Sequence, residues 1–376
     1  MANEQEKFGL PYVLIDFKTK GTTAIKRSAR GIVVMILHNE SKDEIKTYRI
    51  SDVSDIPTTG LSETNVDLIK KCLMGTPLRV LVYTLPNAEV DSAQNTQATV
   101  LKLISNTKFN YICAPTAINQ EQADLVSWVK SMNENKGKTY MAVVANQAAD
   151  NEFIINFTTD KIEVDAGDDG EGNPLYKTYT ALQYTARIAG ILAGLALDRS
   201  ATYFKLTEVH SVEKYEDIDD HIDKGELVLF DEEDGDGVKI ARACNSLTTF
   251  TTDKGESFRK IKIMEGIAMV KNDIRDTFKK YYVGKVINDY DHKLLFIAAI
   301  LVYFSEISGN VLDASAKNTV DIDEQFQRNK AILAGEKVED MTVMDIRKYN
   351  TGDTLALAGS VKFVDAMENL KIDFTM

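Results

Sequence analysis

Three apolar segments separated by two stretches of helical pattern determine the fold: residues 78–85 (LRVLVYTL), 110–113 (NYIC) and 139–145 (TYMAVVA). Each is rich in β-branched, aromatic or other apolar residues, which is typical of strands buried on both faces of a sheet. The intervening residues 95–106 and 119–135 carry apolar side chains at helical spacing. This alternation predicts a parallel sheet covered by helices, an α/β layer.

The same pattern continues on both sides of this core. Residues 31–37 (GIVVMIL) and 153–157 (FIINF) predict two further strands. The apolar residues 179–197 predict a helix in which Gly190 and Gly194 stand four apart. That spacing lets a second backbone approach closely, so we expect tight packing of this helix against a neighbour.

The rest of the chain predicts a mixture of elements. Residues 165–174 (DAGDDGEGNP) favour a solvated loop, and residues 226–242 favour a hairpin around an acidic turn. Further on, the pattern predicts an amphipathic helix through 263–278 with its lysines outside, a buried helix over 293–307, a helix near 323–334, and strands near 341–347 and 355–365. The longest apolar run, residues 294–304, is shorter than the roughly 20 residues of a membrane span.

Charge is distributed unevenly along the 376 residues. The formal net charge is −13, which argues against general binding to nucleic acid or anionic membranes. Residues 160–236 hold 20 acidic and 7 basic residues, so the whole imbalance lies there. Residues 254–285 have an excess of basic residues, with nine Lys or Arg and four Asp or Glu. Oppositely charged faces suit a molecule that assembles in a fixed orientation.

The sequence offers no motif for catalysis, cofactors or metals. It contains neither a G-x-x-x-x-G-K-[ST] loop nor a G-x-G-x-x-G after a strand, and no H-E-x-x-H pair. Counting a calcium loop from Asp165 puts Tyr176 at the twelfth position, where a glutamate is needed. The three cysteines are far apart and are expected to be buried thiols. We therefore predict no enzyme activity, no catalytic residues, no cofactor and no metal.

Each end of the chain contains a strand pattern without a local partner, in residues 12–17 (YVLIDF) and 370–376 (LKIDFTM). An unpaired strand is an aggregation hazard unless something pairs with it. Two interpretations are equally open from the pattern: both strands pack on their own domain as edge strands, or both are donated to sheets of neighbouring molecules.

Seven segments distributed over the whole chain carry a family resemblance: 9–17 (GLPYVLIDF), 29–34 (ARGIVV), 184–194 (YTARIAGILAG), 200–203 (SATY), 245–251 (NSLTTFT), 282–289 (YVGKVIND) and 361–368 (VKFVDAME). They resemble the contractile tail sheath proteins of myophages and R-type bacteriocins, and most of all those of Gram-positive phages and defective-phage-like particles. The resemblance favours donation of the terminal strands.

The resemblance implies a mixed α/β fold without the β-sandwich insertion that larger family members carry after the strand at 78–85. It implies an α/β middle domain with a helix-covered sheet, and a C-terminal α+β assembly domain completed by the arm strands. The expected division is an N-terminal arm (1–20), a β segment (21–62), the middle domain (63–247), the assembly domain (248–365) and a C-terminal arm strand (366–376).

The resemblance also implies a function. Such a subunit stacks as hexameric rings around a tail tube, joined by its arms, and contracts from a metastable extended state to drive the tube through a cell envelope. The implied partners are further copies of the chain, the tube protein, the baseplate and the tail terminator or collar. Nucleic acid is not among these partners, and the subunit contacts a membrane only indirectly, through the whole particle. Assembly in the bacterial host cytoplasm and a place in a released virion or phage-tail-like particle are expected.

Two sets of residues are the candidate assembly sites. The arms are expected to contact neighbours, and a basic helix is expected to face the tube. The arm residues are Tyr12, Val13, Leu14, Ile15, Phe17, Leu370, Ile372 and Phe374, and the basic helix residues are Lys260, Lys271, Arg275, Lys279 and Lys280. Two alternatives stay open, another tail component such as a tube or terminator protein, and an α/β hydrolase. The sequence does not separate a phage from a bacteriocin.

Overall fold

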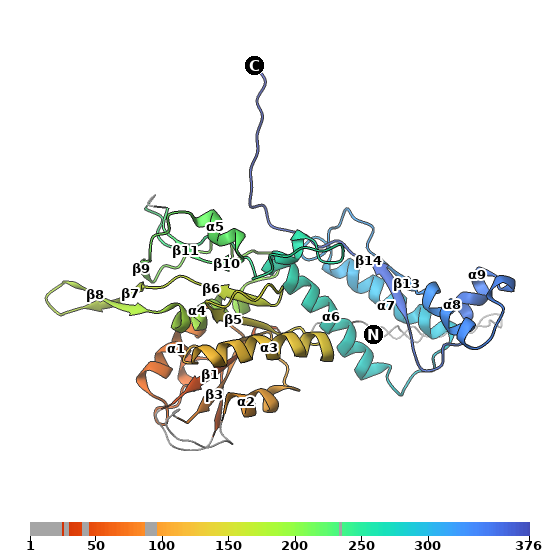
Figure 1. Ribbon diagram of the computed structural model, residues 1–376, viewed down its shortest axis with the longest axis horizontal. Helices are drawn as coiled ribbons and strands as arrows, with labels where there is room; N and C mark the ends of the chain where they lie inside the picture. Colours follow the sequence, from red (N-terminus) through yellow and green to blue (C-terminus); the bar gives the residue numbers. More distant parts are fainter. Residues whose placement is uncertain (1–24, 26–29, 40–44, 87–95, 233–234) are drawn as a thin grey trace, which may run out of the picture.

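The computed structural model describes residues 25, 30–39, 45–86, 96–232 and 235–376. The α/β layer lies at one end of an elongated molecule and a mainly helical region at the other, and helix α6 (Ile261–Tyr281) runs between them (Figure 1). Within these ranges no helix combines the length and the apolar character needed to cross a bilayer. The mixed α/β fold class expected from the sequence is confirmed.

A seven-stranded sheet forms the centre of the α/β layer. From one edge to the other its strands are β10 (Glu226–Leu227), β6 (Ile154–Phe157), β5 (Met141–Ala145), β4 (Tyr111–Cys113), β1 (Ile32–His38), β3 (Arg79–Leu85) and β2 (Lys46–Ile50). All neighbouring pairs are parallel except β2 with β3. The predicted parallel sheet is confirmed, and the three segments that determined the fold are β3, β4 and β5.

Helices cover both faces of this sheet. One face carries α1 (Glu63–Leu73) and α4 (Ala181–Gly194), and the other carries α2 (Gln97–Ile104) and α3 (Asn119–Lys136). Successive side chains of β1 point to opposite faces of the sheet. Val33 and Met35 pack with α1 and α4, whereas Val34 and Ile36 pack with α2 and α3. Because both faces are buried, the strands read as uninterrupted apolar runs.

Helices α1 and α4 touch through their backbones. A Cβ atom on Gly190 would lie 2.0 Å from the carbonyl oxygen of Cys72, and one on Gly194 would lie 1.7 Å from that of Gly75. No side chain fits at either position without moving one helix. The expected role of the Gly190 and Gly194 pair in tight packing is confirmed.

A second, three-stranded sheet projects beside the layer in the order β8 (Pro174–Tyr179), β7 (Ile162–Asp168) and β9 (Val209–Ser211). The antiparallel β7–β8 hairpin extends away from the body (Figure 1). The solvated loop predicted for residues 165–174 is therefore wrong in extent. Only residues 169–173 form the turn, which closes when the Asp169 carboxylate accepts hydrogen bonds from the backbone N–H groups of Glu171 and Asn173.

The hairpin predicted over residues 226–242 is confirmed in a shorter form. Strand β11 (Leu229–Phe230) pairs antiparallel with β12 (Lys239–Ile240). The residues just before β11 instead join the main sheet as β10. Helix α5 (Ile218–Asp223) packs beside them through Ile218 and Ile222.

The helical region is built on α6 and α7 (Tyr290–Ile307), which share one apolar cluster. A two-stranded antiparallel sheet, β13 (Thr319–Ile322) with β14 (Leu357–Ser360), packs on α7. The remaining elements are α8 (Glu324–Leu333), α9 (Val343–Lys348) and the 3₁₀ turns η1 (Val53–Asp55), η2 (Glu256–Arg259) and η3 (Val338–Asp340).

Three expectations for this region need correction. Residues 343–348 form a helix and not the predicted strand, because Thr342 and Asp345 make a capping box at its start. The helix expected to be buried, α7, exposes one apolar face. Not every lysine of α6 points outward, since Lys262 is buried and donates a hydrogen bond to the carbonyl oxygen of Val364.

Candidate assembly surfaces

The C-terminal segment, residues 366–376, extends away from the body (Figure 1). Leu370 and Phe374 are 85% and 88% exposed, and Ile372 is also exposed. These residues form no strand in the single subunit, and pairing of the predicted arm strand over 366–376 with a neighbour stays a prediction. Exposed apolar side chains at alternate positions are suited to contact another molecule.

The root of this segment is anchored to the body by Glu368, a residue that sequence reasoning did not single out. Its carboxylate is 8% exposed and forms ion pairs with Arg242 at 3.3 Å and Lys260 at 3.5 Å. The hydroxyls of Ser200 and Thr202 donate hydrogen bonds to it at 3.0 and 2.7 Å. Burial opposes ionisation of Glu368, but the Thr202 hydrogen bond and the charge of Lys260 outweigh it and lower the pKa.

The β13–β14 sheet is a second candidate surface. Within the described residues it has two strands, so each strand keeps an edge without a strand partner. Two-stranded sheets are marginal unless they pack on something, and here Val320 and Leu357 pack on the apolar cluster of α6 and α7. The open edges are suited to accept an incoming strand.

The five residues of the predicted basic helix do not share one environment. Lys260, just before α6, contacts the carboxylates of Asp365 and Glu368 at the root of the C-terminal segment. Arg275 donates a hydrogen bond to the carbonyl oxygen of Gly137 at 2.5 Å. Both are therefore engaged within the subunit. The other three predicted residues, Lys271, Lys279 and Lys280, lie exposed on α6.

Helix α7 adds an apolar face that the sequence analysis took for core. Leu295, Leu301 and Val302 are each at least 40% exposed, and Ala298 lies exposed between them. These positions recur at helical spacing and form a continuous stripe. The opposite side of α7 carries Phe296, Ile300 and Tyr303 into the core, so an apolar run alone did not reveal which side is covered.

Arg30 and Gly31 lead into strand β1, and Ile25 is buried in the apolar cluster of α6 and α7. Gly31 has a φ of +79°, and a Cβ atom there would lie 2.7 Å from the carbonyl oxygen of Ala193. Only glycine fits this conformation and this close approach. The predicted N-terminal arm residues lie outside the described residues, namely Tyr12, Val13, Leu14, Ile15 and Phe17.

The histidines and two of the cysteines hold structural positions. His38, His221 and His292 each bond a carboxylate, those of Glu121, Glu226 and Asp289, and His210 stacks on Tyr176. Burial raises the pKa of Cys72 to about 12 and that of Cys244 to about 11, so both thiols stay protonated. The part of the chain that the structure describes holds no group of three potential metal ligands.

Comparison with solved structures relates the fold to known assemblies. The sheath tail protein from Desulfitobacterium hafniense superposes with a TM-score of 0.65 at 19% identity, covering 83% of this chain and 94% of that one. The helical sheath of the anti-feeding prophage in its contracted state superposes with a TM-score of 0.67 at 15% identity, covering 98% and 99%. At such identities the likeness establishes the fold.

Sequence comparison establishes the family. The model of the phage tail sheath protein central domain matches residues 91–246, and the model of the phage tail sheath C-terminal domain matches residues 253–376. Protein XkdK of the Bacillus subtilis phage-like element PBSX is 30% identical over 177 residues, covering 46% of this chain and 35% of that protein. The tail sheath protein of Clostridium phage phiCD119 is 35% identical over 382 residues, covering 98% of this chain and 99% of that protein. The chain therefore belongs to the phage tail sheath protein family.

Proposed function

We propose that this sheath subunit polymerises as stacked hexameric rings around a tail tube, and that its two terminal arms complete sheets in neighbouring subunits. The exposed C-terminal segment carries this proposal. Its apolar side chains alternate at Leu370, Ile372 and Phe374, and they lie in water in the single subunit. Donated to the β13–β14 sheet of a neighbour, they would gain main-chain hydrogen bonds and apolar contact at once.

The anchored root makes the arm able to transmit force. Glu368 is held by two hydroxyl donors and two cations, and the exposed apolar Leu370 follows two residues later. A single ladder hydrogen bond contributes only about 0.5–1.5 kcal/mol net, but several in each arm, repeated over many subunits, add to a continuous mesh. Such a mesh would keep subunits joined while they rearrange from the extended to the contracted state, driving the tube through the target envelope.

Contacts with the tube are assigned to the exposed cations of α6. Lys271, Lys279 and Lys280 lie on its surface, and contacts between exposed charges orient partners with modest affinity. Contraction requires the sheath to leave the tube, so weak contacts suit this role. The stripe on α7 and the acidic segment 160–236 are assigned to contacts between subunits or to the outer surface.

The likeness to a chain of the 6-fold symmetrised baseplate of the anti-feeding prophage supports the hexameric ring and a baseplate partner (TM-score 0.62, 15% identity). We propose a terminator or collar at the other end, as the resemblance to sheath proteins implies. We assign the arms to residues 1–20 and 366–376, the middle domain to 63–247 and the assembly domain to 248–365. We further propose that the subunit is not an enzyme, is assembled in the host cytoplasm and ends in the tail of a virion or phage-tail-like particle.

Negative-stain electron microscopy tests this function. The full chain is expressed with and without its tube protein. We expect extended sheathed tails in the presence of the tube and cogwheel-like tubes without it. Closed single rings that never stack, or a permanently monomeric protein at high concentration, would contradict the proposal.

A further inference from the structure

A wide groove lies beside the root of the C-terminal segment. Its volume is about 1320 Å³, and its walls are the loop after α4, helix α5 and residues 365–369. Aromatic and aliphatic side chains form part of its lining, among them Tyr203, Phe204, Ile218 and Phe230. The ring of Tyr203 is 54% exposed, and its centre lies 5.4 Å from that of Phe230. An aromatic surface is therefore open to a partner in this groove.

Tyr203 is held in a conformation that tyrosine rarely adopts. Its φ is +58°, in the left-handed region where a residue with a Cβ atom is strained. The backbone N–H of Tyr203 donates to the carbonyl oxygen of Ile240 at 2.8 Å, and its phenol donates to the Glu232 carboxylate at 3.0 Å. These bonds fix the ring at the groove. Backbone strain that the surrounding structure enforces is concentrated at functional surfaces, which supports a binding role for this one.

The groove has an acidic border. Asp198, Glu216 and Asp219 are exposed in it, and none of the three forms an ion pair with a residue that the structure describes. Of the three cations in its lining, two already pair with carboxylates of the same subunit. A partner that is both basic and apolar complements this surface.

The loop between α6 and α7, residues 282–289, has that character. Val283 and Ile287 are 55% and 74% exposed, and Val286 is exposed between them. Lys285 lies within the loop and two lysines precede it, so residues 279–288 hold three lysines and no acidic residue. The loop thus matches the groove in apolar character and opposes it in charge.

The loop has a defined shape before any partner binds. The backbone N–H of Lys285 donates to the carbonyl oxygen of Tyr282 at 2.9 Å. The amide of Asn288 donates to the carbonyl oxygens of Gly352 and Thr354 at 2.8 and 3.2 Å. Those two residues lie just before β14, so the loop is tied to the β13–β14 sheet. A surface that is already ordered loses little conformational entropy on docking.

Within one subunit, the groove and the loop lie at opposite ends of α6 (Figure 1). The groove adjoins the start of the helix, where Lys260 contacts the carboxylates of Asp365 and Glu368 in the groove wall. The loop follows the last turn of α6. A helix of 21 residues is about 30 Å long. The loop of a subunit therefore does not reach the groove of the same subunit.

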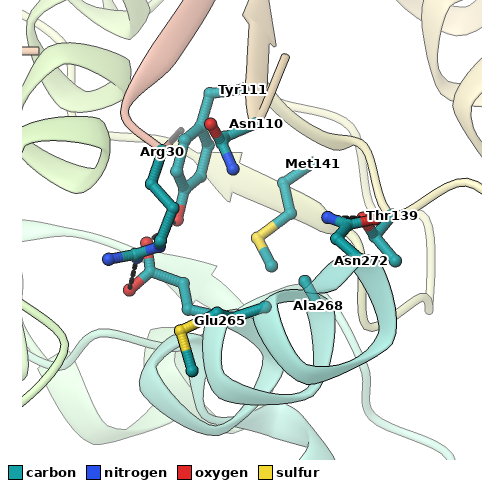
Figure 2. A pocket seen from close by; sticks show the side chains of 9 residues that line it. Arg30, Asn110, Tyr111, Thr139, Met141, Glu265, Ala268 and Asn272 are labelled. Atoms are coloured by element: carbon teal, nitrogen blue, oxygen red, sulfur yellow. Dashed lines mark hydrogen bonds and ion pairs between the residues drawn. The ribbon is translucent and has the colours of Figure 1, made fainter. Parts of the chain in front are cut away.

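The α/β layer keeps α6 in place between these two surfaces. The Glu265 carboxylate accepts a hydrogen bond from the phenol of Tyr111 at 2.5 Å and lies 3.8 Å from the guanidinium of Arg30. Figure 2 shows these three side chains pointing toward one another, with Asn272 beside Thr139 farther along the helix. The cavity that they line is about 20 Å³, room for one water molecule. The groove and the loop thus keep a fixed separation, and a loop that fills the groove comes from a second copy.

We propose that the α6–α7 loop of one subunit docks in the groove of another. This rests on the proposed function and adds a second contact between two copies that an arm joins. The arm, residues 369–376, starts at the groove wall and reaches at most about 26–29 Å. The copy whose β13–β14 sheet receives the arm therefore lies near the groove, and its own loop is tied to that sheet. Because the groove and the loop are different surfaces, the contact is head-to-tail, and every added copy leaves one of each open.

Cysteine cross-linking of the purified full-length protein with a short bismaleimide tests the contact. Ile287→Cys puts a thiol on the loop and Asp219→Cys puts one in the groove, both at exposed positions, whereas the native cysteines are buried. We expect cross-linked dimers when the two variants are mixed and none from either variant alone. A chain with both substitutions should give a ladder of multimers. Ile287→Cys mixed with Leu103→Cys, an exposed position on α2, is the matched control and should give no dimers.

Reversing the charge of the loop tests the complementarity. Lys285→Glu in the Ile287→Cys chain should lower the yield of dimers roughly tenfold, and Lys102→Glu, the control on α2, should leave it unchanged. No dimers from the mixture, dimers from Ile287→Cys alone, or a doubly substituted chain that stops at dimers would overturn the proposal.

Electron microscopy of the wild-type protein separates this proposal from the proposed function. Normal sheaths from a protein whose variants give no cross-links would exclude the groove contact and leave the function standing. Cross-links without sheaths would support the contact and contradict the function.

Discussion

The hydroxyl of Thr202 donates a 2.7 Å hydrogen bond to the Glu368 carboxylate, joining the loop after α4 to the root of the C-terminal segment. The two residues are 166 positions apart in the chain. This contact, with those of Ser200, Arg242 and Lys260, determines where the exposed segment leaves the body. An arm that starts from a defined point can reach a defined site on a neighbour.

Replacing Glu368 by Ala should therefore uncouple the arm from the body. We expect a loss of about 1.5–3 kcal/mol in the anchoring of the root, because hydrogen bonds to a charged group are removed and their donors lose a partner. Sheaths should become short or absent in electron micrographs, while the circular dichroism spectrum stays unchanged. Lys371→Ala, beyond the root, serves as a control that should assemble normally, and normal sheaths from Glu368→Ala would contradict the anchoring role.

Adding a methyl group at Gly190 should destabilise the fold. The Cβ atom of Gly190→Ala would lie 2.0 Å from the Cys72 carbonyl oxygen, so α1 and α4 must separate. We expect a drop of about 3 kcal/mol in the free energy of unfolding, measured by urea denaturation. Gly255→Ala is the matched control, because nothing lies within 4 Å of its Cβ position and its φ is −77°. Equal stabilities of the two variants would argue against the backbone contact.

The pair between His38 and Glu121 should make stability depend on pH. The Glu121 carboxylate lies 2.8 Å from the ring of His38, and this hydrogen bond raises the pKa of His38 above 6.5 against the effect of burial. Burial opposes ionisation of Glu121, but the same bond lowers its pKa below 4.5. The ion pair thus makes its full contribution to the free energy of unfolding between pH 4.5 and 6.5. Its contribution is lost as the pH rises through the raised pKa of His38, and also on acidification.

His38→Gln should accordingly lower the free energy of unfolding by about 1 kcal/mol at pH 5.5, and by less at pH 8.5. His210→Gln is the control, since the His210 ring stacks on Tyr176 in the projecting hairpin. If His38→Gln loses more free energy of unfolding at pH 8.5 than at pH 5.5, the predicted direction of the pH dependence is wrong.

Reversing two exposed charges on α6 tests the proposed contact with the tube. Lys279→Glu combined with Lys280→Glu should prevent extended sheaths from forming on the tube, while the subunit keeps its melting temperature because both side chains are exposed. Lys102→Glu on α2, also exposed, gives the same kind of reversal on the α/β layer and should leave sheathing intact. Extended tails of normal appearance from the double variant would exclude these lysines from the tube contact.

The strands that are buried on both faces of the sheet could be predicted from the sequence. Strands such as β3 and β5 are apolar on both faces, so their pattern has one interpretation. The β7–β8 hairpin was missed in part because the glycines and aspartates of its turn mask the alternation of Ile162 and Val164. The exposed stripe of α7 was missed because an apolar helix in one subunit looks the same whether its own domain or a neighbour covers it.

Single buried charges are the features that sequence reasoning could not find. Glu265 and Lys262 lie on α6 among other charged residues, and nothing in their spacing separates them from solvated neighbours. Their partners, Arg30, Tyr111 and Val364, come from distant parts of the chain. Glu368 does lie within the segment 361–368 that resembles sheath proteins, so that resemblance was the available signal.

The most direct test of the central claim is deletion of residues 369–376, which removes the exposed arm and keeps Glu368. Sedimentation and electron microscopy of the truncated protein are compared with those of the full chain at equal concentration. The account predicts a folded, monodisperse monomer with an unchanged melting temperature that never forms sheaths, since the deleted side chains contribute nothing to the single subunit's core. Intact sheaths of normal length from the truncated protein would contradict it.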